Sequence, residues 1–232
     1  IFAFGSCRVQ DNKFVEHFVF GPPYTHDIKC VSQYIEYFEN PNKWYALPSA
    51  AKKAIIWKPW ITFEQLKDAY EKSDIILIEI SSLKLKMYNN VAHSDWRLLR
   101  EGEERKYRKK IRANYELNPP QTYNELVNDI KLIKRKVSKP VIFQGHANLL
   151  FPNNTVENDE VKGNDIRITS REIIDNAIIA EVEDNNRIII NEIFGDKYNN
   201  DHWRDLNSSW HYSDKGYKLI AEKVNKMIQS IK

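Results

Sequence analysis

The stretch DIILIEI, residues 74–80, decides the fold. It is an almost continuous apolar run of strand length, which is typical of a central parallel strand covered on both faces. Parallel strands need long crossover connections, usually helices. Strands and helices should therefore alternate on both sides of 74–80.

Helix start signals follow this alternation. The segments 62–70, 122–137 and 169–182 each open with Thr and carry Gln or Glu three residues later. This spacing is a capping box, in which the two side chains satisfy backbone N–H groups of the first turn. The last segment, 213–231, is amphipathic, with Ser213 as its expected cap. Four helices are predicted on this basis.

The remaining segments complete an α/β pattern. Strands are expected at 1–5, 139–145 and 186–194, and the apolar spacing of 7–20 predicts a helix. Alternating strands and helices predict a three-layer α/β/α sandwich with a mostly parallel sheet. We expect one domain over residues 1–232. The chain begins with Ile rather than Met, which is consistent with a domain of a longer protein.

Composition narrows the class of protein. Hydrophobic residues make up 42% of the chain, charged residues 29%, and the formal net charge is +3. This charge is too small to indicate nucleic-acid binding, and no run of about 18 apolar residues predicts a membrane span. Two cysteines are too few for a disulfide framework. We therefore expect a cytoplasmic globular protein with neither nucleic-acid partner nor membrane span.

One region interrupts the alternation. Residues 82–118, rich in Lys, Arg, Trp and Tyr, separate the strand 74–80 from its next helix. One interpretation is a solvated helical insertion. The other is a basic lid at the carboxyl end of the sheet, where open α/β sheets bind ligands. On the second interpretation, the residues nearest the strand end would bind the phosphates of a ligand: Lys84, Lys86, Arg97 and Arg100.

Cys7 follows the expected first strand directly and begins the expected helix 7–20. Helix N-terminal N–H groups favour negative charge, so they would lower the pKa of this thiol and stabilise an oxyanion. Arg8 adds a positive charge beside Cys7, and Ser6 precedes it. The alternative is a small side chain that fills a tight strand–helix junction.

The other end of the chain favours the functional interpretation. Residues 208–224, SSWHYSDKGYKLIAEKV, place His211 just before the last helix. A nucleophile after the first strand and a histidine before the last helix resemble the SGNH (GDSL-like) hydrolase superfamily. The triplet Gly5-Ser6-Cys7 aligns with that family's Gly-Asp-Ser, so the resemblance implies Cys7 as nucleophile and His211 as catalytic histidine. The triplet is also similar to a GSCFA-type, polysaccharide-biosynthesis branch, whose members include coenzyme A-dependent sugar acetyltransferases.

The chain departs from the family pattern in two blocks. The resemblance puts Ser208 where the family has the triad Asp, which leaves a Cys–His dyad or orientation of the histidine by Asp205. It puts Ser81 or Ser82 where the family has an oxyanion-binding Asn. A Ser hydroxyl cannot stabilise an imidazolium as a carboxylate does.

Further candidates lie at the same expected edge of the sheet. His146 and Asn148 follow the strand 139–145 and are candidate substrate contacts, and Trp210 neighbours His211. His26, in a Pro-rich turn, is expected to be structural. No His, Cys, Asp or Glu spacing predicts a metal site.

These observations predict an acyltransferase that uses acetyl-coenzyme A as co-substrate, without a metal. The acceptor implied by the resemblance is a hydroxyl or amine of a sugar or nucleotide sugar. A thioester at Cys7 suits a thioester donor, and the basic insertion suits coenzyme A phosphates. The alternatives are an SGNH-type carbohydrate esterase or deacetylase, with water as acceptor, and a catalytically inactive glycan-binding domain.

Overall fold

A computed structural model of the chain describes residues 1–6, 9, 12–22, 24–56, 58, 60–97, 99–146, 158–195, 204–205 and 208–231. At its centre, four strands form a parallel sheet in the order β1-β2-β5-β6. These strands are β1 (Phe2–Phe4), β2 (Ile76–Glu79), β5 (Val141–Gln144) and β6 (Arg187–Ile188). Ile76 pairs with both Phe2 and Val141, so β2 is an interior strand, as predicted from the run 74–80.

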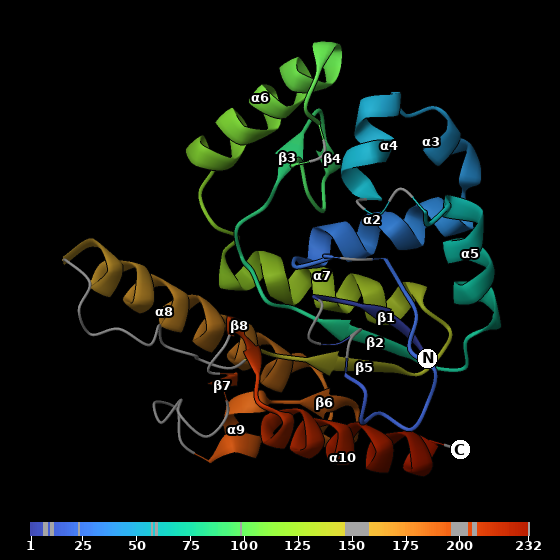
Figure 1. Ribbon diagram of the computed structural model, residues 1–232. Coiled ribbons are helices and arrows are strands. Elements are labelled where there is room, and N and C mark those ends of the chain that lie inside the picture. The colour runs from blue at the N-terminus through green and yellow to red at the C-terminus, as the bar shows by residue number, and fades with distance from the viewer. Residues whose placement is uncertain are drawn as a thin grey trace.

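Helices connect the strands and cover the sheet (Figure 1). They are α2 (Ile28–Glu39), α3 (Pro41–Tyr45), α4 (Ser49–Ile55), α5 (Phe63–Lys72), α6 (Gly102–Leu117), α7 (Tyr123–Lys136), α8 (Asn158–Glu181), α9 (Ile190–Phe194) and α10 (Asp214–Ile231). Two antiparallel pairs lie outside the main sheet: β3 (Met87–Tyr88) with β4 (Val91–Ala92), and β7 (Arg204–Asp205) with β8 (Ser208–Tyr212). A single 3₁₀ turn, Asp184–Asn186, precedes β6.

Each face of the sheet has its own apolar core. Ile76, Ile78 and Phe143 point to the side covered by α2, α7 and α8. Leu77 and Ile142 point to the opposite side, where α9 and α10 pack. Burial of an Ile, Leu or Phe side chain contributes about 1.5–3 kcal/mol, so both layers stabilise the sheet. The expected α/β class with a parallel sheet is confirmed.

Two of the helix starts are confirmed at atomic detail. Thr62 and Gln65 bond reciprocally at the start of α5, as do Thr122 and Glu125 at the start of α7. At the start of α10, Ser213 Oγ accepts the N–H of Gly216 at 3.2 Å. The capping residues therefore fix where these helices begin.

The helix expected over 7–20 is wrong for the residues 12–20. These residues form turns and an extended segment beside β1, where Phe20 makes a parallel bridge to Phe2. Gly21 packs so closely on this strand that a Cβ would lie 1.8 Å from the carbonyl oxygen of Ala3. Pairing with β1 thus overrides the helical spacing of the apolar residues.

Other boundaries also differ from the expectation. The sequence predicted no helix at 28–39, yet α2 begins there with Asp27 as its cap. The helix expected from Thr169 starts earlier, at Asn158. The strand expected over 186–194 is short, because α9 follows it directly and ends at Gly195 in the left-handed region, with φ of 70°.

The insertion 82–118 holds the β3–β4 hairpin and α6, so it is only partly helical. It leaves the sheet after β2 and rises beside α2 and α4 (Figure 1). Over the part of the chain that the structure describes, every helix is too short or too polar to cross a membrane.

Candidate functional site

The carboxyl ends of the central strands bring polar residues to one edge of the sheet. Ser6 follows β1, Ser81 follows β2 and His146 follows β5. Because these strands are parallel, the three residues share one side of the sheet, here named the carboxyl edge. This is the edge at which open α/β sheets bind their ligands.

A buried carboxylate lies at the carboxyl edge. Glu79, the last residue of β2, is fully buried and accepts the backbone N–H of Ser6 at 2.7 Å. Gly5 permits this approach, because a Cβ there would lie 2.9 Å from Glu79 Cβ. Burying a carboxylate is costly unless polar partners stabilise it. Glu79 was not among the predicted site residues, although an acid flanked by Ile78 and Ile80 in an apolar run was an available signal.

The two ends of the chain meet beside this carboxylate. Cys7 and Arg8 lie outside the described residues, and Val9 packs in the same core as Tyr212. The amide of Asn12 donates to the carbonyl of Tyr217 at 3.2 Å. The first turns of α10 therefore contact the segment that follows Cys7.

His211 belongs to β8, and its neighbour Tyr212 marks the position of this strand at the carboxyl edge. The rings of Tyr212 and His146 lie 5.9 Å apart, and both side chains are buried. The backbone of Asp205 pairs with that of Ser208 in the β7–β8 pair. The remaining predicted residues at this end fall outside the description: Asn148 entirely, and the side chains of Asp205, Ser208, Trp210 and His211.

Gly145, the residue before His146, packs against a second buried acid. A Cβ on Gly145 would lie 2.1 Å from Asp175 Oδ1, so this carboxylate of α8 packs on the chain directly before His146. The other oxygen of Asp175 accepts the amide of Asn191 at 2.8 Å. The end of β5 thus carries a buried histidine and packs, through Gly145, against a buried acid.

Ser81 and Ser82 surround His26, which sequence analysis took for a structural residue. The backbone N–H groups of both serines donate to the carbonyl of His26 at 2.9 and 3.0 Å. Ser81 Oγ lies 2.9 Å from His26 Nδ1, whereas Ser82 Oγ bonds with the backbone of Lys84. Oxyanion binding by these serines stays a prediction, and their backbone N–H groups already have an acceptor.

The four cations proposed for phosphate binding differ in their contacts. Lys84 donates to the carbonyl of Asn118 at 2.9 Å, and Lys86 donates to that of Ser94 at 2.7 Å. Arg97 pairs with Asp95 at 2.5 Å but keeps 61% of its side chain exposed. Arg100 is exposed and donates weakly, at 3.5 Å, to the carbonyl of Arg97. The two arginines therefore have the more accessible charges.

His93 lies inside the insertion and is fully buried. Its Nδ1 lies 3.0 Å from the carbonyl of Lys86, and its Nε2 lies 3.1 Å from the hydroxyl of Tyr107. Burial lowers the pKa of His93 to about 4. Both ring nitrogens have protein partners, so this histidine joins the hairpin to α6.

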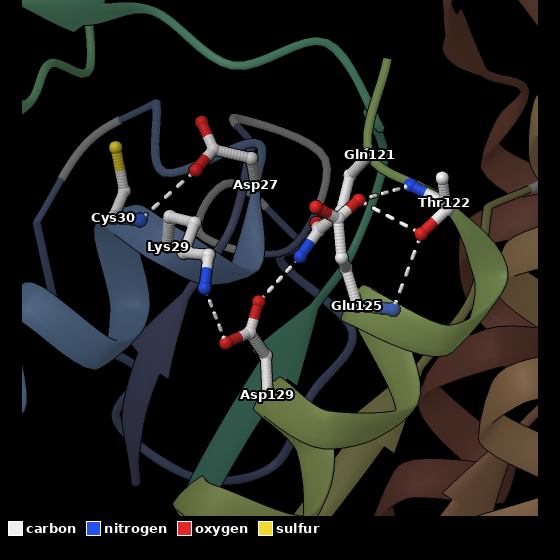
Figure 2. Close-up of polar contacts among 7 residues, drawn as sticks. All are labelled: Asp27, Lys29, Cys30, Gln121, Thr122, Glu125 and Asp129. Atoms are coloured by element: carbon white, nitrogen blue, oxygen red, sulfur yellow. Dashed lines mark hydrogen bonds and ion pairs between the residues drawn. The ribbon is translucent and has the colours of Figure 1, made fainter. Parts of the chain in front are cut away.

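Figure 2 shows a further group of polar contacts, between α2 and α7. Asp129 accepts Lys29 Nζ at 2.6 Å and also accepts the amide of Gln121. Asp27 accepts the N–H of Cys30 at 2.9 Å, and burial raises the pKa of Asp27 and, strongly, that of the Cys30 thiol. The contacts of Asp129 tie two helices together, and burial keeps the Cys30 thiol in its protonated, unreactive form.

Within the described ranges no three His, Cys, Asp or Glu side chains group as metal ligands. Comparisons of the chain with protein-family models, with curated proteins and with solved structures found no match. The resemblance to the SGNH superfamily therefore rests on the residues of this chain alone.

Proposed function

We propose that the chain is an acyltransferase that moves an acetyl group from acetyl-coenzyme A to a hydroxyl or amine of a sugar or nucleotide sugar. Cys7 acts as the nucleophile and His211 as its base. The observation that carries the proposal is the contact between the two chain ends. Asn12 bonds to Tyr217, and Lys13 pairs with Asp214 at 3.2 Å. The segment after Cys7 therefore adjoins the helix that follows His211.

Glu79 adds chemical support. Its carboxylate accepts the N–H of Ser6, the residue before Cys7, at 2.7 Å. The Cys7 thiol is proposed to rest protonated, because a nearby carboxylate disfavours a thiolate, and Cys7 then needs a base when it reacts. The same charge stabilises an imidazolium that forms when a histidine takes the thiol proton. In this mechanism Glu79 takes the part of the carboxylate that Ser208 cannot supply.

Acyl transfer then proceeds in two steps. The Cys7 sulfur forms a bond to the acyl carbon while His211 takes the thiol proton, and the leaving thiolate of coenzyme A receives that proton. An acceptor hydroxyl or amine next attacks the thioester, its proton passes to His211, and Cys7 regains its thiol. The exposed guanidinium groups of Arg97 and Arg100 suit the phosphates of the donor.

The test measures release of free coenzyme A from acetyl-coenzyme A, with a mixture of nucleotide sugars as acceptors. We expect Cys7→Ala and His211→Ala each to reduce release by about a hundredfold or more, the scale of losing a positioned base or nucleophile. His17→Ala is the matched control, because His17 lies beside Phe18, whose carbonyl bonds to the amino terminus at the opposite edge of the sheet. Full activity in both catalytic variants would contradict the proposal. Release that needs no sugar would instead identify a hydrolase.

A further inference from the structure

His26 and Ser81 form a hydroxyl–imidazole pair at the carboxyl edge. The distance from His26 Nδ1 to Ser81 Oγ is 2.9 Å, within the range expected between a base and the nucleophile it activates. Both side chains are only partly buried. His26 has no role in the Cys7–His211 proposal, and Ser81 enters it only as a predicted oxyanion donor.

The backbone holds this pair rigidly. The carbonyl of His26 accepts N–H groups from Ser81 and Ser82 at 2.9 and 3.0 Å. The next residue, Asp27, is buried and caps α2. His26 is therefore fixed between the end of β2 and the start of α2. Such preorganisation on regular elements is what a reactive pair requires.

A cation and a strained residue accompany the pair. The rings of Tyr24 and His26 lie 6.0 Å apart, and the guanidinium of Arg97 lies 5.9 Å from the centre of the Tyr24 ring. Tyr24 adopts a φ of 61°, in the left-handed region that side chains as large as Tyr rarely occupy. Backbone strain of this kind collects at functional sites. The exposed charge of Arg97 suits an acyl donor that carries phosphates.

We propose that Ser81 is a second acyl acceptor of the carboxyl edge and that His26 is its base. The inference rests on the acyl-transfer function proposed above and extends it to a second nucleophile. Ser81 Oγ forms a bond to the acyl carbon, and its proton passes to His26 Nδ1. The bond from that carbon to the leaving thiolate or alkoxide breaks, and the leaving group takes the proton from His26. An acyl ester at Ser81 remains, and water cleaves this ester more slowly than an acceptor cleaves the Cys7 thioester.

The experiment uses p-nitrophenyl acetate as a general acyl donor at neutral pH. After short incubations the chain is digested with trypsin, and fragmentation of the peptide 73–84 locates the acetyl group by mass spectrometry. We expect acetylation at Ser81 in the wild type and none at this position in Ser81→Ala. His26→Gln should slow acetylation by about a hundredfold, the contribution typical of a positioned base. Ser73→Ala is the matched control and should be acetylated at Ser81 at the wild-type rate, because Ser73 lies on the same peptide but precedes β2, where its Oγ donates to the carbonyl of Tyr70 at 2.8 Å.

The outcomes separate this inference from the proposed function. Cys7→Ala should lose turnover with acetyl-coenzyme A and still become acetylated at Ser81. If Ser81→Ala abolishes turnover and Cys7→Ala retains it, Ser81 is the main nucleophile and only the Cys7 proposal fails. Circular dichroism confirms that each variant is folded. The inference is overturned if Ser81 stays unmodified in the folded wild type, or if His26→Gln is acetylated at the wild-type rate.

Discussion

The insertion 82–118 and the carboxyl edge are both polar, but their polar groups are used differently. In the insertion, His93 bonds at both ring nitrogens, and Lys86 donates to the carbonyl of Ser94. At the carboxyl edge, Glu79 and the His26–Ser81 pair gather where parallel strands end. The insertion uses its polar groups to hold its own backbone, whereas the edge gathers them at the side where open α/β sheets bind ligands. Placement, rather than polarity, therefore separates a functional candidate from a structural one.

The largest expected effect is acid destabilisation through His93. Its folded-state pKa of about 4 lies below the ordinary 6.5, so the unfolded state binds the proton more readily. The contribution of His93 to the free energy of unfolding is complete above pH 6.5 and declines as the pH falls toward 4. This difference between the folded and ordinary pKa corresponds to about 3 kcal/mol in the free energy of unfolding. Urea unfolding of the wild type and His93→Gln across this range should show their difference in stability shrinking as the pH falls.

If the free energies of unfolding of the wild type and His93→Gln differ by a constant amount over that pH range, His93 is not held neutral. Turnover of His93→Gln, corrected for the folded fraction, should match that of the wild type at neutral pH. Loss of turnover would show that a polar group of the insertion takes part in function, as the groups of the carboxyl edge are proposed to do.

Glu79→Gln tests whether a change at the carboxyl edge lowers turnover and leaves stability unchanged, the reverse of the effects expected at His93. Gln keeps an oxygen that accepts the Ser6 N–H but removes the charge. We expect turnover to fall by about a hundredfold, the scale of losing one preorganised electrostatic group, with little change in urea stability. Steady-state kinetics and unfolding curves are compared with Glu64→Gln, an exposed acid of α5. Unchanged turnover would make Glu79 a structural acid.

Asp129→Ala sharpens the comparison with a buried acid that lies away from the strand ends. It removes the partner of Lys29 and Gln121 between α2 and α7. We expect a loss of about 2 kcal/mol in the free energy of unfolding, since buried polar groups lose an acceptor. Asp68→Ala, which breaks the exposed pair with Lys72, should cost at most about 0.5 kcal/mol. Turnover should persist in both variants. Loss of turnover in Asp129→Ala would show that function also depends on the contacts between α2 and α7.

The smallest expected effect concerns Arg97 and Arg100. Binding of acetyl-coenzyme A to the wild type should weaken with salt, because exposed charges are screened within about 10 Å at 0.1 M. The double variant Arg97→Ala/Arg100→Ala should bind severalfold more weakly and depend less on salt. Lys84→Ala/Lys86→Ala is the matched control, since these lysines already donate to carbonyls. If the lysine control loses more affinity for acetyl-coenzyme A than the arginine variant, the lysines rather than the arginines bind the donor.

Local patterns predicted much of the fold. The run 74–80 predicted the interior strand β2, and the capping boxes at Thr62 and Thr122 predicted helix starts that the structure confirms. The helix predicted over 12–20 was wrong because pairing of Phe20 with β1 is a long-range contact, which the spacing of apolar residues does not reveal. The helix at 28–39 was missed, although Asp27 and the apolar spacing of Ile28, Val31, Ile35 and Phe38 were a readable signal.

The candidate site was less predictable than the fold. Ser6, Ser81 and His146 were placed at one edge because parallel topology follows from the strand pattern. His26 was missed because its partner Ser81 is 55 positions away. The bond from the Ser6 N–H to Glu79 likewise spans 73 positions, and no local pattern encodes such pairs.

The central claim, that His211 activates Cys7, is tested most directly by alkylation with iodoacetamide. The chain has two cysteines, and Cys30 is a silent internal reference because it is 1% exposed and burial raises its thiol pKa strongly. We predict a single alkylation at Cys7, slowed at neutral pH by about tenfold or more in His211→Ala, since the thiolate is the reactive form. An unchanged alkylation rate of Cys7 in His211→Ala would contradict the account.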